Sequence, residues 1–301
     1  MVVTPFTQVM GAVFFSGVSQ VVATDNIDDE SDSLVVSCEQ SSAMTPLPLP
    51  VVALAGYHER GMWPLGAFIL QSVEITHLGE RVTFTSAAFD ASMKKKRDKS
   101  YQKLTLKALV AKIAGRHGLR PKCDYDIKLE HVDQKQESDA ALLKRFAQKY
   151  NAIFNIKNGT LIFLHKKSPM LPIFFIFAGE AESYTFRHSN RGWFGKARIK
   201  YHDTKKNKKE EIKIGEMPPE YVFHEMAKNK GEAKALAQAK LERLQGKAHT
   251  ASITLEGQNI IAGGHAICIG FGFRNDGLYL ITRATHTMGS VFKSVVELER
   301  L

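Results

Sequence analysis

The strongest local constraint in this chain is the dipeptide Asn158-Gly159, which lies between two short apolar runs at 153–156 and 161–163. Asn and Gly both tolerate positive φ, and a two-residue turn with that backbone joins antiparallel strands without splaying them. The pattern therefore predicts a β-hairpin whose type I′ turn is formed by Asn158 and Gly159.

The hairpin follows a segment that carries the signals of an amphipathic helix. Ser138 is a suitable N-cap, because its hydroxyl can accept a hydrogen bond from an amide of the first turn. Asp139 places a negative charge at the positive end of the helix dipole, and Asn151 tolerates the left-handed conformation that ends helices. One face is apolar at helical spacing, through Leu142, Leu143, Phe146 and Tyr150. We therefore predict a helix between Ser138 and Asn151.

A partner helix is predicted upstream, with Thr105 as its N-cap and Gly118 at its end. Leu119 is placed to pack back onto it, as in a Schellman motif. His117 lies at the end of this helix, where a cation complements the dipole. Its apolar face consists of Leu106, Leu109, Val110 and Ile113. The two helices and the hairpin form a module of helix, loop, helix and hairpin, in which Leu109, Leu142 and Phe146 are expected to be buried together between the helices.

Short β-type runs flank this module on both sides. The upstream runs lie near residues 21–24, 34–38, 51–54, 67–75 and 82–88. Pro46, Pro48 and Pro50 exclude a helix between them. This spacing of short strands is typical of a small barrel or a sandwich.

The region after the module begins with a connector at 168–182. Phe174, Phe175 and Phe177 in this connector are expected to be buried in a packed strand rather than in a membrane. A hairpin then pairs 197–201 with 212–214, and a helix over 231–245 is expected to end at Gly246. Further strands are expected at 251–255, 265–269, 279–284 and 292–298. The predicted fold class is therefore α+β, mainly β.

The chain is basic, with a formal net charge of +10 and a pI near 9.4. Two lysine runs stand out, at 94–97 and 205–209. Such charge is compatible with a polyanionic partner or with a solvated surface and protein interfaces. Neither run contains the interleaved aromatic residues on which single-stranded nucleic acids stack. We therefore expect the runs to face protein partners or solvent, with a specific nucleic-acid ligand unlikely.

The sequence offers no candidate catalytic, cofactor-binding or metal-binding residues. Three scattered cysteines suggest neither a disulfide framework nor a zinc site, and no apolar run is long enough to cross a membrane. Glu137 and Asp139 could be considered as the acid pair of a glycosidase, but carboxylates at the start of a helix are expected for structural reasons. We therefore predict that the protein is not an enzyme and needs no cofactor.

Three motifs of the module stand in a distinctive order: Ile113-Ala114-x-x-His117-Gly118-Leu119, then Gln134-x-x-Glu137-Ser138-Asp139 followed by a helix, then Asn158-Gly159 in the hairpin. In this order they resemble the late control gene D family of tail proteins from contractile-tailed temperate phages. The resemblance runs from about residue 20 to the end and is strongest at 100–167 and 260–301. Gln134, Glu137, Ser138, Asp139, Asn158 and Gly159 are the residues of the family motif, and their role is expected to be structural.

The resemblance implies a structural baseplate hub that adapts the tail tube to the central spike, with a fold related to the hub part of type VI secretion spikes. It implies two small β-barrel-like domains, at 1–92 and 169–301, with the helix–helix–hairpin module at 93–168 between them. The expected partners are two further copies in a homotrimer, together with tube, spike and baseplate proteins. The expected location is the virion tail, reached from the bacterial cytoplasm during assembly. The alternative is a basic nucleic-acid-binding regulator of late phage genes.

Overall fold

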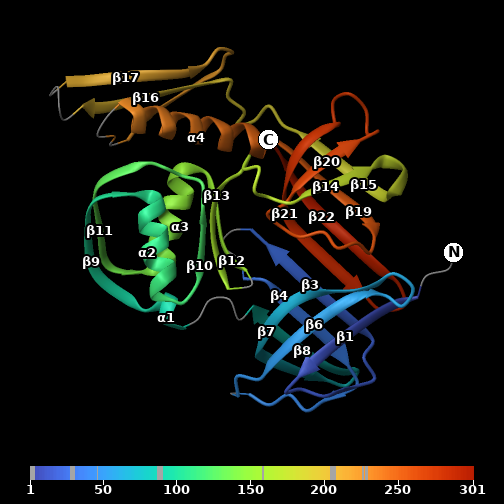
Figure 1. Cartoon of the computed structure of the whole chain (residues 1–301). Coiled ribbons are helices and arrows are strands. Elements are labelled where there is room, and N and C mark those ends of the chain that lie inside the picture. The colour runs from blue at the N-terminus through green and yellow to red at the C-terminus, as the bar shows by residue number, and fades with distance from the viewer. Residues whose placement is uncertain are drawn as a thin grey trace. The chain divides into compact units, whose positions relative to one another are not determined.

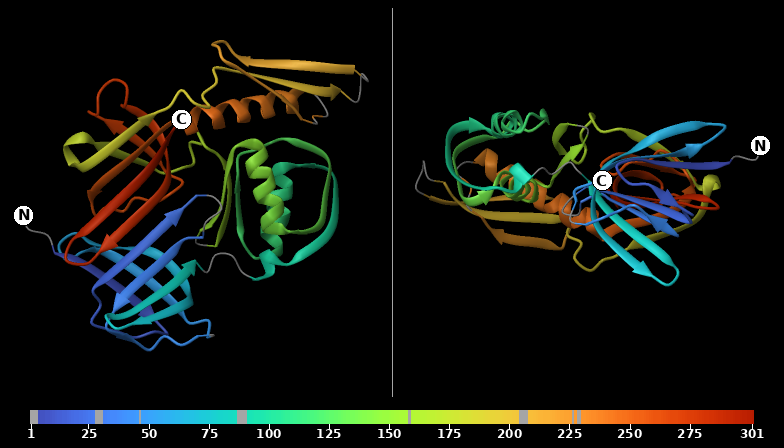
Figure 2. Two further views of the ribbon diagram at one scale, coloured as in Figure 1. Left: turned by 180° about the vertical axis from the view of Figure 1, so that it is seen from behind. Right: turned by 90° about the horizontal axis from the view of Figure 1, so that it is seen from below.

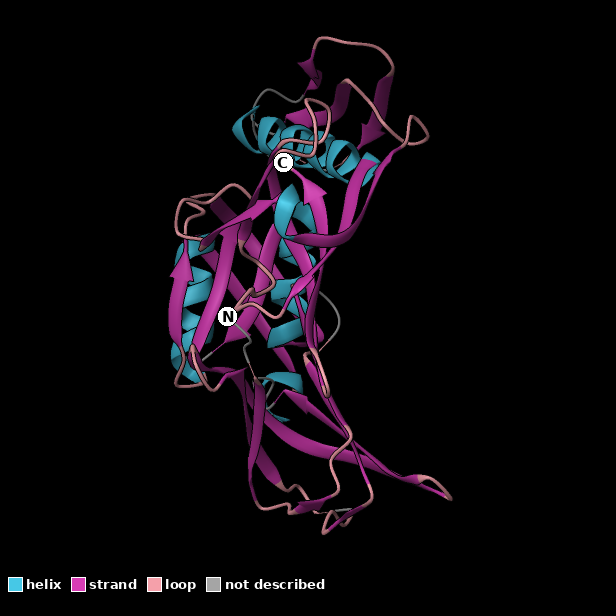
Figure 3. Ribbon diagram, turned by 90° about the vertical axis from the view of Figure 1, so that its right-hand side faces the viewer, coloured by secondary structure: helices cyan, strands magenta, loops and turns pink. Residues whose placement is uncertain are grey.

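In the computed structural model, residues 4–27, 31–45, 47–86, 91–157, 159–203, 208–225, 227 and 230–301 are described. Their fold is α+β and mainly β, as predicted, and most of the ribbon in Figure 3 is strand. The chain divides into two compact units, each assembled from separated segments. Unit 1 comprises 1–90, 172–185 and 252–298, and unit 2 comprises 91–171, 186–251 and 299–301. The expected domain boundaries at 92 and 168 stay a prediction.

Unit 1 is built from strands (Figure 1). The strands from its first segment are β1 (Pro5–Gly11), β2 (Phe15–Ser16), β3 (Gln20–Asn26), β4 (Ser33–Cys38), β5 (Gln40–Ser41), β6 (Pro50–Tyr57), β7 (Gly61–Thr76) and β8 (Gly79–Ser86). The later ones are β14 (Ile173–Phe177), β15 (Ala181–His188), β19 (His249–Glu256), β20 (His265–Ile269), β21 (Gly277–Met288) and β22 (Phe292–Arg300), with the short 3-10 helix η1 (Ala178–Glu180). The last residues of β15 and β22 and the first of β19 belong to unit 2.

Twelve of these strands form one continuous sheet, in the order β1-β6-β7-β8-β4-β3-β21-β22-β19-β15, with β14 and β20 branching from β21. The early and late strands meet where β3 pairs antiparallel with β21. Side chains alternate between the two faces of a strand, so Leu34, Val36 and Cys38 of β4 all enter the core. Among the described residues the sheet has open ends at β1 and β15, so no closed barrel is observed.

The connector contains a strand, as expected, but its phenylalanines are not all buried. Ile176 is fully buried, whereas Phe175 is 56% and Phe177 43% exposed. The period of two in β14 places residues 173, 175 and 177 on the face opposite Ile176. The expectation of burial is therefore wrong for Phe175 and Phe177. No helix of the described chain is long and apolar enough to span a membrane.

Unit 2 holds the predicted module and the lysine-rich hairpin (Figure 2). Its helices are α1 (Ala91–Lys94), α2 (Leu106–Arg116), α3 (Asp139–Tyr150) and α4 (Lys230–Ala248). Its strands are β9 (Lys96–Thr105), β10 (Arg120–Cys123), β11 (Lys128–Ser138), β12 (Ala152–Lys157), β13 (Thr160–His165), β16 (Lys196–Asp203), β17 (Lys208–Gly215) and β18 (Glu220–His224).

The helix ends of the module are as predicted. Thr105 and Ser138 accept hydrogen bonds from the third helical amides of α2 and α3, at 3.2 and 3.1 Å. Asn151 ends α3 with φ of 51°. At the end of α2, Gly118 has φ of 65° and the amide of Leu119 reaches the carbonyl of Ala114, which is the Schellman arrangement.

The rest of the module is richer in strands than predicted. The expected loop between the helices contains β10 and β11, and β11 pairs with β9 in a two-stranded ribbon. The helices lie between this ribbon and the β10-β13-β12 sheet, with α2 packed mainly on β10 and α3 on β12 (Figure 1). Leu109, Leu142 and Phe146 are buried, as expected.

The last helix, α4, packs on β16 and β17 and runs through Gly246 to Ala248. The predicted end at Gly246 is therefore wrong. The side chain of Glu299 in β22 occupies the space beside Gly246, so an added Cβ would lie only 2.2 Å from its carboxylate oxygen Oε1. The glycine thus permits a close approach inside the helix, and it does not end it. The hairpin of β16 and β17 pairs Ile199 with Ile212, as predicted. Its tip at 204–207 lies outside the described residues.

Candidate functional site

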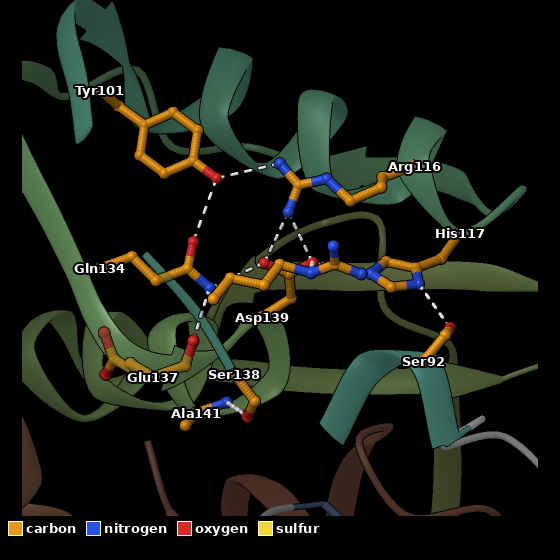
Figure 4. A network of polar contacts seen from close by, with 10 residues as sticks. Ser92, Tyr101, Arg116, His117, Gln134, Glu137, Ser138, Asp139 and Ala141 are labelled. Carbon is orange, nitrogen blue, oxygen red and sulfur yellow. Dashed lines mark hydrogen bonds and ion pairs between the residues drawn. The ribbon is translucent and has the colours of Figure 1, made fainter. Parts of the chain in front are cut away.

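The most connected polar group of unit 2 is the carboxylate of Asp139, the first residue of α3. Its side chain is fully buried, although Asp is a residue type that is seldom fully buried without a partner. β11 ends at Ser138 and α3 begins at once, so the capped helix start fixes where the carboxylate lies. Figure 4 shows that it faces the end of α2, where Arg116 and His117 lie.

Four side chains surround this carboxylate. Arg116 Nη1 donates to both oxygens, at 2.7 and 2.6 Å, and His117 Nε2 lies 2.8 Å from Oδ2. Gln134 Nε2 donates to Oδ1 at 2.8 Å, and Arg97 Nε lies 3.4 Å from Oδ2. The charge of Asp139 is therefore balanced by cations that come from β9 and from the end of α2.

The same groups are linked to one another. Tyr101 of β9 donates to Gln134 Oε1 at 3.2 Å and accepts from Arg116 Nη2 at 3.0 Å. Gln134 also donates to the carbonyl of Glu137 at 2.9 Å. We call Tyr101, Arg116, His117, Gln134 and Asp139 the Asp139 network. It joins both strands of the ribbon to both helices, so it holds the module together through satisfied polar groups.

The electrostatics follow from burial and pairing. Burial alone would raise the pKa of Asp139, but the hydrogen bonds from Gln134, His117 and Arg116 outweigh it and hold the pKa below its usual value. Burial would lower the pKa of Arg116, but its contacts with Tyr101 and Asp139 raise it. The ion pair is therefore the charged form of both groups at neutral pH.

His117 extends the network to α1. Its Nδ1 lies 2.8 Å from Ser92 Oγ, while its Nε2 faces Asp139. When the ring is neutral, Nε2–H donates to the carboxylate and Nδ1 accepts from the Ser92 hydroxyl. His117 thus does more than complement the end of α2, because its ring joins that end to the start of α3.

The order Ser92, His117 and Asp139 is that of a nucleophile, a base and an orienting acid. The Asp139 carboxylate is, however, neutralised by Arg116, and the His117 side chain is only 4% exposed. These contacts fix the position of the start of α3.

Glu137 does not pair with Asp139 as an acid pair would. Arg145 Nε and Nη2 hold its two carboxylate oxygens at 3.0 and 2.8 Å, and Nη2 also donates to the carbonyl of Asp133 at 3.2 Å. This clamp ties α3 to β11 on the exposed side. Among the described residues no group of three His, Cys, Asp or Glu side chains could hold a metal ion.

The predicted motif residues fall into two places. Gln134, Glu137, Ser138 and Asp139 come together at the junction of β11 and α3, whereas Gly159 lies in the turn between β12 and β13 with φ of 68°. Asn158 lies outside the described residues, so the turn type stays a prediction. Sequence reasoning missed the roles of Ser92, Tyr101 and Arg116. The adjacent Arg116-His117 at one helix end and the acidic start of the next helix were the available signal.

Comparison with known proteins identifies a family that this chain matches. The model of the phage tail baseplate hub (GPD) matches residues 74–291, which is more than half of the chain. A probable baseplate hub protein of Escherichia phage 186 is 27% identical over 205 residues, covering 64% of this chain and 53% of that protein. Its counterpart from Escherichia phage P2 is 29% identical over 199 residues, covering 60% and 51%. The chain thus spans about half the length of the curated relatives it matches.

Solved structures show the same fold at low sequence identity. The 43 kDa tail protein of prophage MuSo2 from Shewanella oneidensis has a TM-score of 0.69 at 13% identity, with 98% of both chains covered. The tail protein from Neisseria meningitidis MC58 has a TM-score of 0.70 at 12% identity, with 97% and 96% covered. A type VI secretion component from E. coli has a TM-score of 0.62 at 11% identity, with 98% and 77% covered. The family match, supported by this shared fold, establishes that the chain belongs to the phage tail baseplate hub (GPD) family.

Proposed function

We propose that this chain is a structural subunit that adapts the tail tube to the central spike in a contractile phage tail or phage-tail-like particle. The observation that carries the proposal is the family match over 74–291. The fold shared with prophage tail proteins over nearly the whole chain supports it. By this proposal the protein lies in the baseplate of the virion tail and passes through the bacterial cytoplasm only during assembly.

We infer further that the working form is a homotrimer. The early strands β1, β3, β4 and β6–β8 and the later strands of unit 1 occupy separate stretches of one sheet, which are joined where β3 pairs with β21. This arrangement supports two barrel-like domains, at 1–92 and 169–301, with the module at 93–168 between them in sequence. Three copies would supply a ring of six such domains. Ring closure would also cover the open strand edges at β1 and β15, which are otherwise prone to aggregation.

The work proposed is that of an adaptor and conduit, without catalysis. The buried Asp139 binds Arg116 and His117, and on the exposed side Glu137 binds Arg145, so these acidic groups are engaged with basic residues of the module. The tube, spike and other baseplate proteins are the proposed partners. Their contacts would fall on surfaces of the chain that are exposed in the single subunit.

The test uses a phage or prophage from which the gene for this chain is deleted and then restored with an epitope tag. Tail particles are purified on a density gradient and labelled with an antibody to the tag. We expect complete tails only after restoration, with label at the baseplate end. Normal tails in the deletion strain, or tag that sediments with DNA and never with tails, would overturn the proposal.

A further inference from the structure

The net charge of +10 is the sum of the net charges of the two units, which have opposite signs. Unit 1 contains 15 Asp and Glu against 5 Lys and Arg, for a net charge of −10. Unit 2 contains 16 Asp and Glu against 36 Lys and Arg, for a net charge of +20. The two lysine runs account for only part of this excess, because basic residues are spread along the whole of 91–171 and 186–251. Each copy therefore carries one acidic and one basic body.

Ion pairs inside unit 2 leave a surface dominated by lysine. Its acidic groups are paired with arginines, as in Arg116–Asp139, Arg145–Glu137 and Arg198–Glu220, and with a few of its lysines, as in Lys149–Glu232 and Lys166–Glu299. The exposed lysines include three around Thr105: Lys103, Lys107 and Lys128, which is paired in register with Thr105 across the ribbon. None of the three makes an ion pair within the described part of the chain. They place three positive charges at this end of the ribbon.

Unit 1 presents the opposite charge. Glu39, Glu59 and Glu180 are exposed and come from three different parts of its sequence. Its five basic residues, Arg60, Arg81, Arg274, Arg283 and Lys293, cannot neutralise 15 carboxylates. Its surface is therefore complementary to that of unit 2.

We propose that the acidic unit 1 of one copy docks on the basic unit 2 of the next copy, and that the lysines around Thr105 are part of the contact. The inference rests on the proposed self-assembly and adds a contact between copies to the covering of the strand edges of β1 and β15. A contact between like units of two copies would bring like charges together, whereas a contact between unit 1 of one copy and unit 2 of the next brings opposite charges together. Repeated head to tail, such a contact forms a ring when its rotation closes. Charge complementarity also speeds encounter and rejects the wrong orientation.

A second copy fits the basic unit better than DNA does. Two of the arginines that could bind phosphate bidentately, Arg116 and Arg145, are engaged by carboxylates. The remaining lysines are point charges that act at long range with little geometric selectivity. The complementary acidic body is present on every copy at equal concentration, so the contact needs no further component.

The first experiment measures self-association of the full chain by light scattering and sedimentation velocity at about 0.05 M and about 0.5 M salt. Screening weakens opposite-charge contacts and relieves like-charge repulsion, so the sign of the salt effect identifies the contact. We expect the association constant to fall at least about tenfold at the higher salt. Association that is unchanged or strengthened by salt, or a monomer under both conditions, would overturn the inference. Association with tail particles would still test the hub proposal separately.

The second experiment reverses the lysines in the triple variant K103E/K107E/K128E, with K103R/K107R/K128R as the matched control that keeps the charge. The reversed variant should lose most of its low-salt association while the arginine variant keeps it. Both variants should have the same melting temperature as the parent chain, because the three side chains are exposed. A reversed variant that melts early is replaced by Glu39→Lys with Glu180→Lys in unit 1, which should weaken association in the same way.

Double-stranded DNA of random sequence is the competing ligand and is titrated against the same variants at about 0.15 M salt. The inference predicts that lysine reversal lowers self-association by a larger factor than it lowers DNA binding. Reversal that abolishes DNA binding and leaves self-association untouched would assign the basic unit to nucleic acid instead.

Discussion

Arg116 and Asp139 form a two-point ion pair across the module, with Nη1 of Arg116 2.7 and 2.6 Å from the two carboxylate oxygens. One residue ends α2 and the other begins α3, so the pair joins two helices that the chain separates by two strands. The Asp139 side chain is fully buried, and removing one member of such a pair leaves an uncompensated charge.

Asp139→Asn is therefore expected to lower the free energy of unfolding by about 3 kcal/mol, because Arg116 would keep its charge without its main partner. The measurement is urea unfolding of both proteins at pH 7. Glu130→Gln is the matched control, because Glu130 is an exposed residue of β11. It should change stability by less than about 0.5 kcal/mol. Equal stability of the Asp139 variant and the parent chain would show that the network does not hold the module.

The same pair predicts a direction for acid unfolding. The pKa of folded Asp139 lies below its usual value, so its stabilising contribution is present above the unfolded pKa, about 3.9, and is lost as pH falls through the folded pKa. The parent chain should lose stability below about pH 4 more steeply than Asp139→Asn does. Unfolding curves recorded from pH 6 to pH 2 check this, and parallel losses in the two proteins would contradict it.

The turn at Gly159 tests a purely local requirement. Its φ is 68° and no neighbouring atom lies within 4 Å of an added Cβ, so backbone strain alone opposes a side chain. Gly159→Val should cost about 1–2 kcal/mol, since a β-branched residue resists positive φ. Gly159→Asn should cost less, because Asn tolerates this region. Thermal melts rank the two variants, and a ranking with Val equal to or better than Asn would refute the turn.

Replacing each of two helical glycines with alanine should change the free energy of unfolding in opposite directions. Gly246 meets the Glu299 carboxylate, which is paired with Lys166 at 3.0 and 3.2 Å, so Gly246→Ala should cost about 1–3 kcal/mol. Gly115 in α2 has no atom within 4 Å of an added Cβ, so Gly115→Ala should add about 0.5–1 kcal/mol. Chemical unfolding of both variants measures the difference. Stabilisation by Gly246→Ala would disprove the close approach.

The features that the sequence predicts well are those decided by a few neighbouring residues. Thr105, Ser138, Asn151 and Gly118 act through local backbone geometry, and each ends or begins a helix as expected. The ribbon of β9 and β11 was missed because its strands are largely polar. Its alternation is also broken by residues with positive φ, Lys103 at 49° and Gln136 at 47°.

Other features depend on residues that are distant in the sequence. Gly246 lies inside its helix and leaves room for Glu299, which arrives from β22, and no local pattern contains that fact. Asp139 carries an expected first-turn charge, yet its network needs Tyr101 and Arg116 from other elements. The opposite charges of the units were hidden for the same reason, since each unit combines separated segments.

The most direct test of the account is cryo-electron microscopy of purified tail particles that contain this chain. The account predicts three copies between the end of the tail tube and the spike, each with α2 and α3 between the ribbon and the β10-β13-β12 sheet. A tail map that accounts for the tube–spike junction without this chain would contradict the proposed function.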